Sequence, residues 1–461
     1  MAEIFTRKFS EVSGGRFDPE FYIGQTIQIV TYPLKNFVKI KSGKRIPKGR
    51  SYANTTTAYK YLRVDDLDSE ILEIDIDKLK SIDKDIFTLL ERYEIYNDEV
   101  ALSIAGTIGK VFIFHNATNN RVILTENCVK LQAQDNLLPK FLSLILKTNF
   151  LQSQMKRQYI QTTIPKLAIE RIKELQIPSI PPLSTQQHII DLMDKAYKAK
   201  QEKENKAKEL LDSIDSYLLE ELGIILPPKA NNTLDSRIYT QKISALSGSR
   251  FDANYHQPYY KKFEQALESG KYKTLRLVDI CQFRRGSFPQ PYGNQEWYGG
   301  ANAMPFVQVA DIDDNFELKE KTNQQISQLA QPKSVFVPQN TIILSIQGTI
   351  GRVAITQYDC YVDRTIAIFT ELSNLLNQHF LAYMLSILFK NKADTARGIT
   401  LKTITKEEFR NFKIPLPPLT EQERIAKEVT QRKTQAKVLK QEAKELLESA
   451  KKEVEHIILG G

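Results

Sequence analysis

The sequence predicts an α+β protein made of two homologous halves, each with a mixed section of strands and short helices followed by a long helix. Three observations support this fold class: an ordered set of motifs occurs twice, each set includes short β-prone runs, and each ends in heptad-spaced apolar residues. Homologous halves imply an internal pseudo-twofold, so we expect the two long helices to lie antiparallel. A chain of 461 residues has room for such a duplication.

The repeated motifs follow the same order in both halves. In pairs they are 13–18 (SGGRFD) with 247–252 (SGSRFD), 102–111 (LSIAGTIGKV) with 344–353 (LSIQGTIGRV), and 177–187 (IPSIPPLSTQQ) with 414–423 (IPLPPLTEQE). Their offsets stay close to half of the chain length. One large unit is therefore duplicated, and the chain is not a solenoid of short repeats.

Each mixed section is expected to contain a strand, a Gly-Thr-Ile-Gly turn and a second strand, followed by a helix and a short Ile-spaced helix. The strands are expected at 100–104 and 111–114 in the first half and at 341–346 and 353–356 in the second; the helices at 139–154 and 377–391; and the short helices at 166–175 and 403–412.

The long helices begin after two Pro-Pro-Leu segments. Ser184 and Thr420 are expected as N-caps, with Gln187 and Glu423 completing a capping box. The heptad spacing that follows predicts a seam against another helix. The first helix should end at Gly223 and the second near the end of the chain, so each has roughly 38 residues and a length of about 57 Å.

These features divide the chain into five parts. The mixed sections are 1–183 and 247–419, the helices are 184–223 and 420–461, and a linker occupies 224–246.

Composition narrows the class of protein. The sequence has 64 Lys plus Arg against 55 Asp plus Glu, and the net charge of +9 favours a polyanionic partner without demanding one. Its three cysteines lie far apart, which excludes a disulfide framework and a zinc ribbon and indicates a reducing compartment. The chain start does not resemble a signal peptide, and the longest apolar stretches are shorter than the ~18–20 residues of a membrane span. We expect a cytoplasmic protein.

Motifs of enzymes that act on nucleic acids are missing. Enzymes that methylate an amino group of a base carry a Pro-Pro pair with a polar residue before it and an aromatic residue after it. The Pro-Pro pairs at 181–182, 227–228 and 417–418 have neither of these neighbours. The turn at 106–111 is too short for a phosphate-cradling loop, and the five histidines have no metal-ligand spacing. We expect no catalytic residue, metal or cofactor in this chain.

One acidic cluster needs a separate interpretation. Asp314, Glu317 and Lys319 loosely resemble the constellation of a metal-dependent nuclease. The counterpart near 70–75 does not keep the spacing, so a solvated acidic loop is the favoured interpretation.

Taken together, these motifs resemble the family of DNA specificity subunits of type I restriction-modification systems. The resemblance covers nearly the whole chain and is carried by the doubled plan of mixed section, Ile-Pro-rich segment and long helix, by the Gly-Thr-Ile-Gly-Lys/Arg-Val turns, and by the section starts at 42–45 and 285–288. The first long helix departs from the pattern at Gln187 and His188, and its seam carries Lys200 and Lys203.

The resemblance implies two target-recognition domains, each reading one half of a bipartite site in double-stranded DNA. It further implies that two methyltransferase subunits using S-adenosylmethionine dock on the helices, giving an adenine methyltransferase, and that motor-nuclease subunits add restriction where they are present. The helix residues assigned to docking are Ile189, Met193, Leu210, Ile214, Ile425, Val429, Leu439 and Leu446.

Candidate DNA contacts are basic or amide side chains near exposed turns, because Lys and Arg bind phosphates while Arg, Gln and Asn read base edges. In the first section they are Lys41, Lys44, Arg45, Lys48, Arg50, Arg63 and Lys110. In the second they are Arg284, Arg285, Gln308, Gln347 and Arg352. Trp297 and Tyr298 are favoured as packing residues.

Two alternatives stay open. The chain could be a coiled-coil scaffold that bridges two protein partners without binding DNA, or a nuclease built around Asp314 and Glu317. A DNA reader should bind duplex DNA with a steep salt dependence, and a scaffold should not. The loss of cleavage in a Glu317→Ala variant would establish the nuclease.

Overall fold

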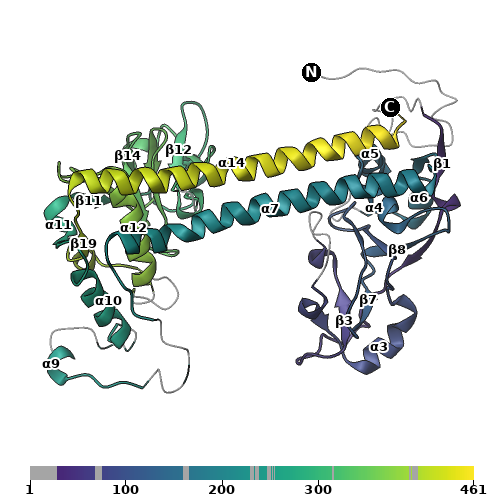
Figure 1. Cartoon of the computed structure of the whole chain (residues 1–461), viewed down its shortest axis with the longest axis horizontal. Helices are drawn as coiled ribbons and strands as arrows, with labels where there is room; N and C mark the ends of the chain where they lie inside the picture. The colour runs from purple at the N-terminus through teal and green to yellow at the C-terminus, as the bar shows by residue number, and fades with distance from the viewer. Residues whose placement is uncertain are drawn as a thin grey trace. The chain divides into compact units, whose positions relative to one another are not determined.

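The protein folds as two compact units, each with its own hydrophobic core (Figure 1). The computed structural model describes residues 29–67, 75–158, 166–228, 233, 238–246, 251, 253, 255–313, 316–393, 396 and 403–460. The first unit joins residues 1–203 to 441–461, and the second spans 204–440. The repeated motif at 13–18 lies outside the described residues, as does its copy at 247–252 except for Phe251.

The first unit contains a four-stranded antiparallel sheet in the order β2-β8-β5-β6, a three-stranded sheet in the order β4-β3-β7, and the pair β1-β9. Strands β3 and β7 are parallel. The strands are β1 (Thr31–Pro33), β2 (Val38–Ser42), β3 (Tyr59–Leu62), β4 (Lys80–Ser81), β5 (Val100–Ser103), β6 (Val111–Ile113), β7 (Arg121–Leu124), β8 (Cys128–Ala133) and β9 (Gln176–Pro178).

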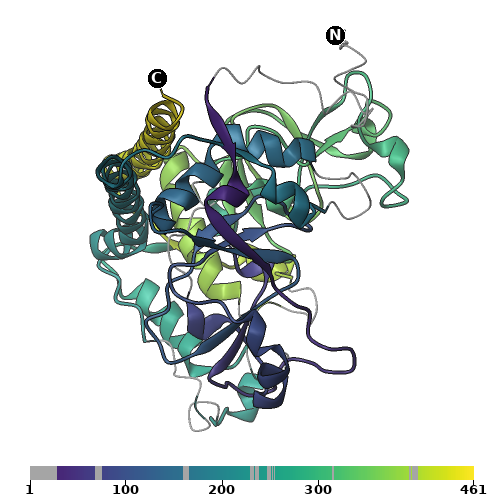
Figure 2. The ribbon, with the colours of Figure 1, turned by 90° about the vertical axis from the view of Figure 1, so that its right-hand side faces the viewer.

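Short helices cover these sheets, as Figure 2 shows for the first unit. They are α3 (Lys84–Leu90), α4 (Pro139–Lys147), α5 (Asn149–Gln158) and α6 (Ile169–Lys173). The sequence predicts one helix over 139–154, and the structure corrects this. Thr148 has extended backbone (ψ 149°) and its hydroxyl accepts the Leu151 N–H at 3.3 Å, which ends α4 and starts α5.

The second unit repeats this plan. Its sheets have the orders β11-β18-β15-β16 and β13-β12-β17-β14, β10 pairs with β19, and β12 and β17 are parallel. The strands are β10 (Thr274–Arg276), β11 (Gln282–Arg285), β12 (Met304–Val307), β13 (Gln324–Ile326), β14 (Val335–Val337), β15 (Ile342–Ser345), β16 (Val353–Ile355), β17 (Cys360–Val362), β18 (Ile366–Thr370) and β19 (Lys413–Pro415). The helices are α9 (Ile243–Leu246), α10 (Pro258–Glu268), α11 (Leu277–Ile280), α12 (Gln378–Lys392) and α13 (Lys406–Arg410).

The repeated Gly-Thr-Ile-Gly turns have the same internal hydrogen bonds. The Ser103 hydroxyl donates to the Thr107 carbonyl at 2.6 Å and accepts the Lys110 N–H at 2.8 Å. Ser345 does the same with Thr349 and Arg352, at 2.6 and 2.9 Å. Both glycines of each turn have positive φ, which glycine adopts without steric cost. The predicted strand-turn-strand unit and the predicted fold class are confirmed.

The long helices are α7 (Leu183–Glu221) and α14 (Leu419–Ile458). Ser184 and Thr420 lie inside them, so the predicted capping boxes are wrong. The helices start directly after Pro182 and Pro418, whose carbonyls accept the first helical hydrogen bonds: Pro182 from the N–H groups of residues 185 and 186, and Pro418 from those of 421 and 422. Helix α7 ends as predicted at Gly223, whose φ of +62° and N–H bond to Glu220 form a Schellman motif with the Ile224 N–H bond to Leu219.

Within each unit, the start of one long helix lies beside the end of the other, so the helices are antiparallel there. In the first unit the Lys203 ammonium is 2.6 Å from Glu442. In the second unit Arg424 forms an ion pair with Glu221, and the Arg432 guanidinium donates to the Ser213 hydroxyl at 3.0 Å.

Candidate nucleic-acid interface

In the first section, basic side chains follow strand β2 on exposed backbone. Gly43 brings this segment against the turn at 125–127: its N–H donates to the Cys128 carbonyl at 3.0 Å, and a Cβ on it would lie 2.0 Å from the Thr125 carbonyl oxygen. Only glycine fits at this approach. The candidates Lys41, Lys44 and Lys48 are all exposed around it.

The candidate arginines of this section have acidic partners. Arg45 Nε lies 2.5 Å from Glu126, and this hydrogen bond raises the pKa of the Arg45 guanidinium. Arg50 pairs with Asp85, and Arg63 pairs with Asp66 at 2.7 Å. Such surface pairs contribute about 0–1 kcal/mol each to the stability of the fold.

Lys110 and Arg352 occupy equivalent positions and have the same structural role. The Lys110 ammonium donates to the carbonyls of Val64 and Leu67 at 3.3 and 2.7 Å. The Arg352 guanidinium donates to the carbonyls of Val309 and Ile312 at 3.4 and 3.1 Å. Both cations therefore stabilise a 3-10 turn, η2 (Val64–Asp66) or η6 (Val309–Asp311). Their assignment as DNA contacts stays a prediction.

The other candidates of the second section lie at different exposures. Arg284 and Arg285 are exposed on β11, and Arg284 donates to the Phe336 carbonyl at 3.1 Å. Gln308 precedes η6, and its backbone N–H donates to Asp311 at 2.9 Å. Gln347 is half-buried and forms an isolated bridge with Thr403. The structure brings Arg284 and Arg285 onto one strand and leaves the two glutamines on separate turns.

Two exposed cations near Arg285 were not among the candidates. Arg364 lies in the turn between β17 and β18, and Lys333 follows β13, with its ammonium 4.1 Å from the Trp297 ring centroid. Neither stands beside a repeated motif, so no local sequence signal points to it. Trp297 itself is a packing residue, as expected: it is 6% exposed, and its indole N–H donates to the Pro291 carbonyl at 3.0 Å.

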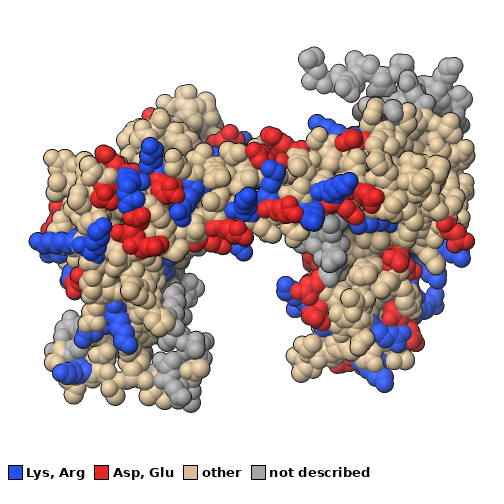
Figure 3. Space-filling view, viewed as in Figure 1, with Lys and Arg blue, Asp and Glu red and all other residues tan. Residues whose placement is uncertain are grey.

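Most of the helix residues assigned to docking are buried in the chain's own cores. Ile189 and Met193 pack in the core of the first unit, and Ile214, Ile425 and Val429 pack in that of the second. Leu210, Leu439 and Leu446 are half-buried. The buried members hold the helices to the mixed sections. Basic and acidic side chains are intermixed on the exposed surface along the long helices (Figure 3).

A buried glutamine ties each long helix to its mixed section. The Gln186 carbonyl oxygen accepts the Leu138 N–H at 2.8 Å, while its amide donates to the carbonyls of Asn136 and Pro181. Gln422 does the same with Asn377, Leu375 and Pro417, and both glutamines are fully buried. The repeated Pro-Pro-Leu-x-x-Gln pattern was the signal for this contact.

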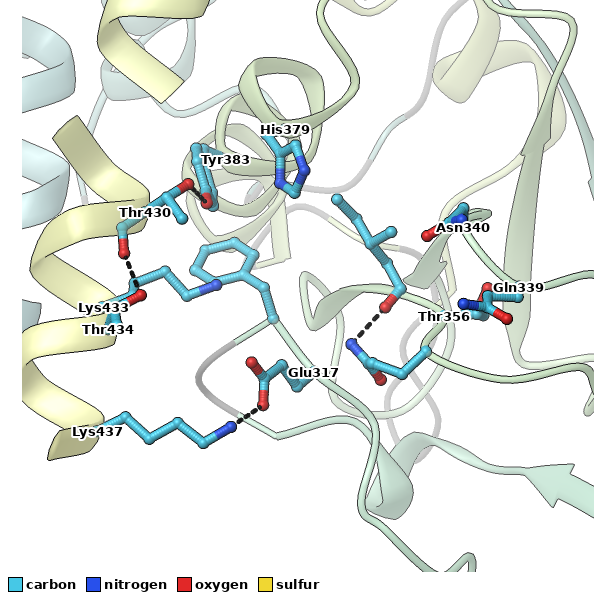
Figure 4. Close-up of a pocket in the computed structure, with 13 residues that line it drawn as sticks. Glu317, Gln339, Asn340, Thr356, His379, Tyr383, Thr430, Lys433, Thr434 and Lys437 are labelled. Carbon is cyan, nitrogen blue, oxygen red and sulfur yellow. Dashed lines mark hydrogen bonds and ion pairs between the residues drawn. The ribbon is translucent and has the colours of Figure 1, made fainter. Parts of the chain in front are cut away.

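A pocket of about 320 Å³ lies in the second unit between α14, α12 and the turn around Phe316 (Figure 4). The Lys433 ammonium lies 4.7 Å from the ring centroid of Phe316 and 5.3 Å from that of Tyr383. Burial lowers the pKa of Lys433 to about 8. Burial, followed by the charge of Lys433, also lowers the pKa of His379.

The same pocket contains Glu317 of the nuclease-like constellation. Its Oε2 lies 2.8 Å from the Lys437 ammonium, and its N–H donates to Asp313 at 2.9 Å. Asp314 lies outside the described residues. Glu317 is therefore an ion-pair partner of helix α14 in this structure.

The described residues provide neither a metal site nor a membrane-spanning helix. Among the residues that the structure describes, no three His, Cys, Asp or Glu side chains gather in a way that could hold a metal ion. No helix in the described ranges combines the length and the apolar character needed to cross a membrane.

Comparison with known proteins gives consistent matches. Residues 27–213 and 269–448 each match the type I restriction modification DNA specificity domain. The chain is 22% identical over 402 residues to the MjaX type I restriction enzyme specificity subunit of Methanocaldococcus jannaschii, covering 84% of each protein. It is 22% identical over 175 residues to the MjaVIII specificity subunit of the same organism, covering 38% of each.

A solved chain of a type I restriction-modification system, from work on its complex assembly and conformational transition, has the same fold. It is 17% identical, with a TM-score of 0.54, and the match covers 93% of this chain and 96% of that one. The scaffold alternative is not favoured by these matches, which fall on both mixed sections and on most of both long helices. The chain therefore belongs to the type I restriction-modification DNA specificity family, whose domain it carries twice.

Proposed function

We propose that this chain selects a bipartite site in double-stranded DNA, with each mixed section reading one half-site. The observation that carries the proposal is the duplication: two sections with equivalent sheets and separate cores each match the DNA specificity domain. The proposed recognition domains are 1–183 and 247–419, with helices 184–223 and 420–461 and a linker at 224–246. The twelve candidate side chains named from the sequence are proposed as the first DNA contacts to test.

The partners belong to the same proposal. Two methyltransferase subunits would dock on the exposed faces of α7 and α14, and S-adenosylmethionine would be bound by them. Motor-nuclease subunits would add DNA cleavage in a system that has them. This chain would supply no catalytic residue, and the assembly would work in the cytoplasm of a bacterium or archaeon.

Methylome sequencing tests the proposal directly. Cells that carry this gene with its methyltransferase gene should methylate adenines in one motif of two defined halves separated by unspecified bases. A continuous, undivided motif would contradict bipartite reading.

An exchange experiment tests whether the sections read independently. Replacing residues 1–180 with the first section of another family member should change one half of the methylated motif and leave the other half unchanged. The wild-type chain expressed from the same plasmid is the matched control. A change in both halves would refute independent reading.

A further inference from the structure

The two mixed sections differ in charge at one equivalent turn. Gly43 and Gly286 occupy the same place: a Cβ on Gly43 would lie 2.0 Å from the Thr125 carbonyl oxygen, and one on Gly286 would lie 2.3 Å from the Asp363 carbonyl oxygen. The residue after Thr125 is Glu126, and the residue after Asp363 is Arg364. An acidic residue in the first section is thus replaced by a basic residue in the second.

The partners of these two residues differ as well. Glu126 forms an ion pair with Arg45, two positions after Gly43. The equivalent position after Gly286 is Phe288, and the Arg364 guanidinium lies 4.7 Å from the centroid of its ring. The charge of Glu126 is thus balanced by an arginine, whereas the charge of Arg364 is held against an aromatic ring.

Two more cations adjoin Arg364. Arg285 precedes Gly286 and is exposed; burial of part of its side chain and the nearby charge of Arg364 both lower its pKa. Lys333 is brought to the same turn by hydrogen bonds of Ser287, whose hydroxyl donates to the Lys333 carbonyl at 3.4 Å and whose carbonyl accepts the Ser334 hydroxyl at 2.7 Å.

These three cations have no acidic partner in the described part of the chain. Arg285, Lys333 and Arg364 form no ion pair there, whereas Arg45, Arg50 and Arg63 of the first section each form one. Like charges at close range destabilise a fold unless an anion neutralises them. Aromatic rings hold two of the three side chains in place, which reduces the conformational entropy lost when an anion binds.

We propose that Arg285, Lys333 and Arg364 form a contact site for the backbone phosphates of duplex DNA, and that the first section has no cation at the position equivalent to Arg364, where Glu126 stands. This proposal rests on the proposed function, because the ligand is taken to be the DNA that the second section is proposed to read. Phosphate is favoured over a base edge because the cations surround one exposed turn and none is oriented by a polar side-chain partner.

The test uses the complex of the full-length chain with its methyltransferase subunit. Dissociation constants are measured at several salt concentrations on the target duplex and on a duplex with a scrambled second half-site. Lys333→Gln and Arg364→Gln should each reduce the slope of log K against log salt by about 0.9 and weaken both duplexes by the same factor. Arg276→Gln is the matched control, because Arg276 is an exposed arginine of the same unit that pairs with Asp279 at 2.8 Å.

A reverse variant tests the asymmetry. Glu126→Gln releases Arg45 from its ion pair without adding a positive charge. The slope should become steeper by up to about 0.9, because one more cation can now contact a phosphate. An unchanged slope in this variant would overturn the statement that Glu126 keeps Arg45 from contacting a phosphate.

The remaining outcomes separate the phosphate site from the proposed function. An unchanged slope in the Lys333→Gln, Arg364→Gln double variant, with target-specific binding by wild type, overturns the phosphate site alone. So does a loss of base discrimination without a change of slope, or weaker subunit assembly in the absence of DNA. A wild-type complex that shows no target-specific binding overturns the proposed function itself. Thermal melting of each variant establishes that it is folded.

Discussion

Replacing Lys433 with methionine should stabilise the second unit at neutral pH. The Lys433 side chain extends from α14 into the pocket beside Phe316 and Tyr383, and burial lowers its pKa from 10.5 to about 8 (Figure 4). The folded state therefore binds the Lys433 proton more weakly than the unfolded state does. The charged form destabilises the fold, and this penalty is fully present below pH 8 and disappears above about pH 10.5.

The size of the penalty follows from the shift of 10.5 − 8 = 2.5 pH units. At about 1.4 kcal/mol per unit, it is at most about 3 kcal/mol. Within this net penalty, the charges of Glu317 and Asp313 favour the ammonium and lower the penalty, while the charge of Lys437 raises it. The His379 ring faces the same pocket. Methionine keeps the unbranched stem but loses the cation–π contacts, worth about 1 kcal/mol. The expected net gain at pH 7 is about 2 kcal/mol.

The assay can report on this unit alone. The chain has one tryptophan, Trp297, which lies in the second unit and is buried, so its fluorescence follows the unfolding of that unit in denaturant. Lys433→Met should be more stable than wild type at pH 7, and this advantage should shrink by up to about 3 kcal/mol as the pH rises to 10.5. The control is Lys440→Met, at an exposed position of the same helix. A pH-independent difference, or a less stable variant at pH 7, would refute the reasoning.

Three further predictions concern the helices and the core. Gln422→Leu should lower the free energy of unfolding by about 1–3 kcal/mol in the same fluorescence assay, because the Pro417 carbonyl is left buried without its partner and two part-buried backbone groups lose theirs. A loss under about 1 kcal/mol would contradict this, and Gln435→Leu, at an exposed position of the same unit, is the control. Inserting seven residues after positions 203 and 440 lengthens each helix by about 10 Å. The gap in the methylated motif should widen while both half-sites stay the same, and a changed half-site would argue against this prediction. Iodoacetamide at pH 8 should label Cys128, Cys281 and Cys360 only after unfolding, because burial raises the pKa of each thiol to about 12. Labelling of the native protein at the rate of the unfolded protein would disprove this.

The sequence predicted the repeated elements well, because their signals are local and periodic. Alternating and heptad-spaced apolar residues mark strands and helices directly, and Gly223 marks a helix end through a backbone conformation that favours glycine. The signals were weaker where a tertiary contact decides the local structure. Thr148 ends a helix inside an apolar run, and α7 and α14 start directly after a proline, one residue before the Ser or Thr that was expected to cap them.

The candidate site was less predictable, because its electrostatics depend on residues far apart in the sequence. Arg45 and Glu126 are 81 residues apart, and Arg50 and Asp85 are 35 apart. A list of basic residues near glycines cannot distinguish a paired cation from an unpaired one. It also placed Lys110 among exposed contacts, although its ammonium donates to two backbone carbonyls of a turn that begins 46 residues earlier.

The duplication preserves the contacts in which a buried polar side chain satisfies backbone groups. The side chains of Gln186 and Gln422 satisfy three such groups each, and the side chains of Ser103 and Ser345 satisfy two. Each unsatisfied buried group costs about 1–3 kcal/mol, while an exposed ion pair is worth about 0–1 kcal/mol. A change such as Glu126 in one half to Arg364 in the other therefore costs the fold little. It alters a surface that we propose contacts DNA, and so the two halves can diverge there while folding in the same way.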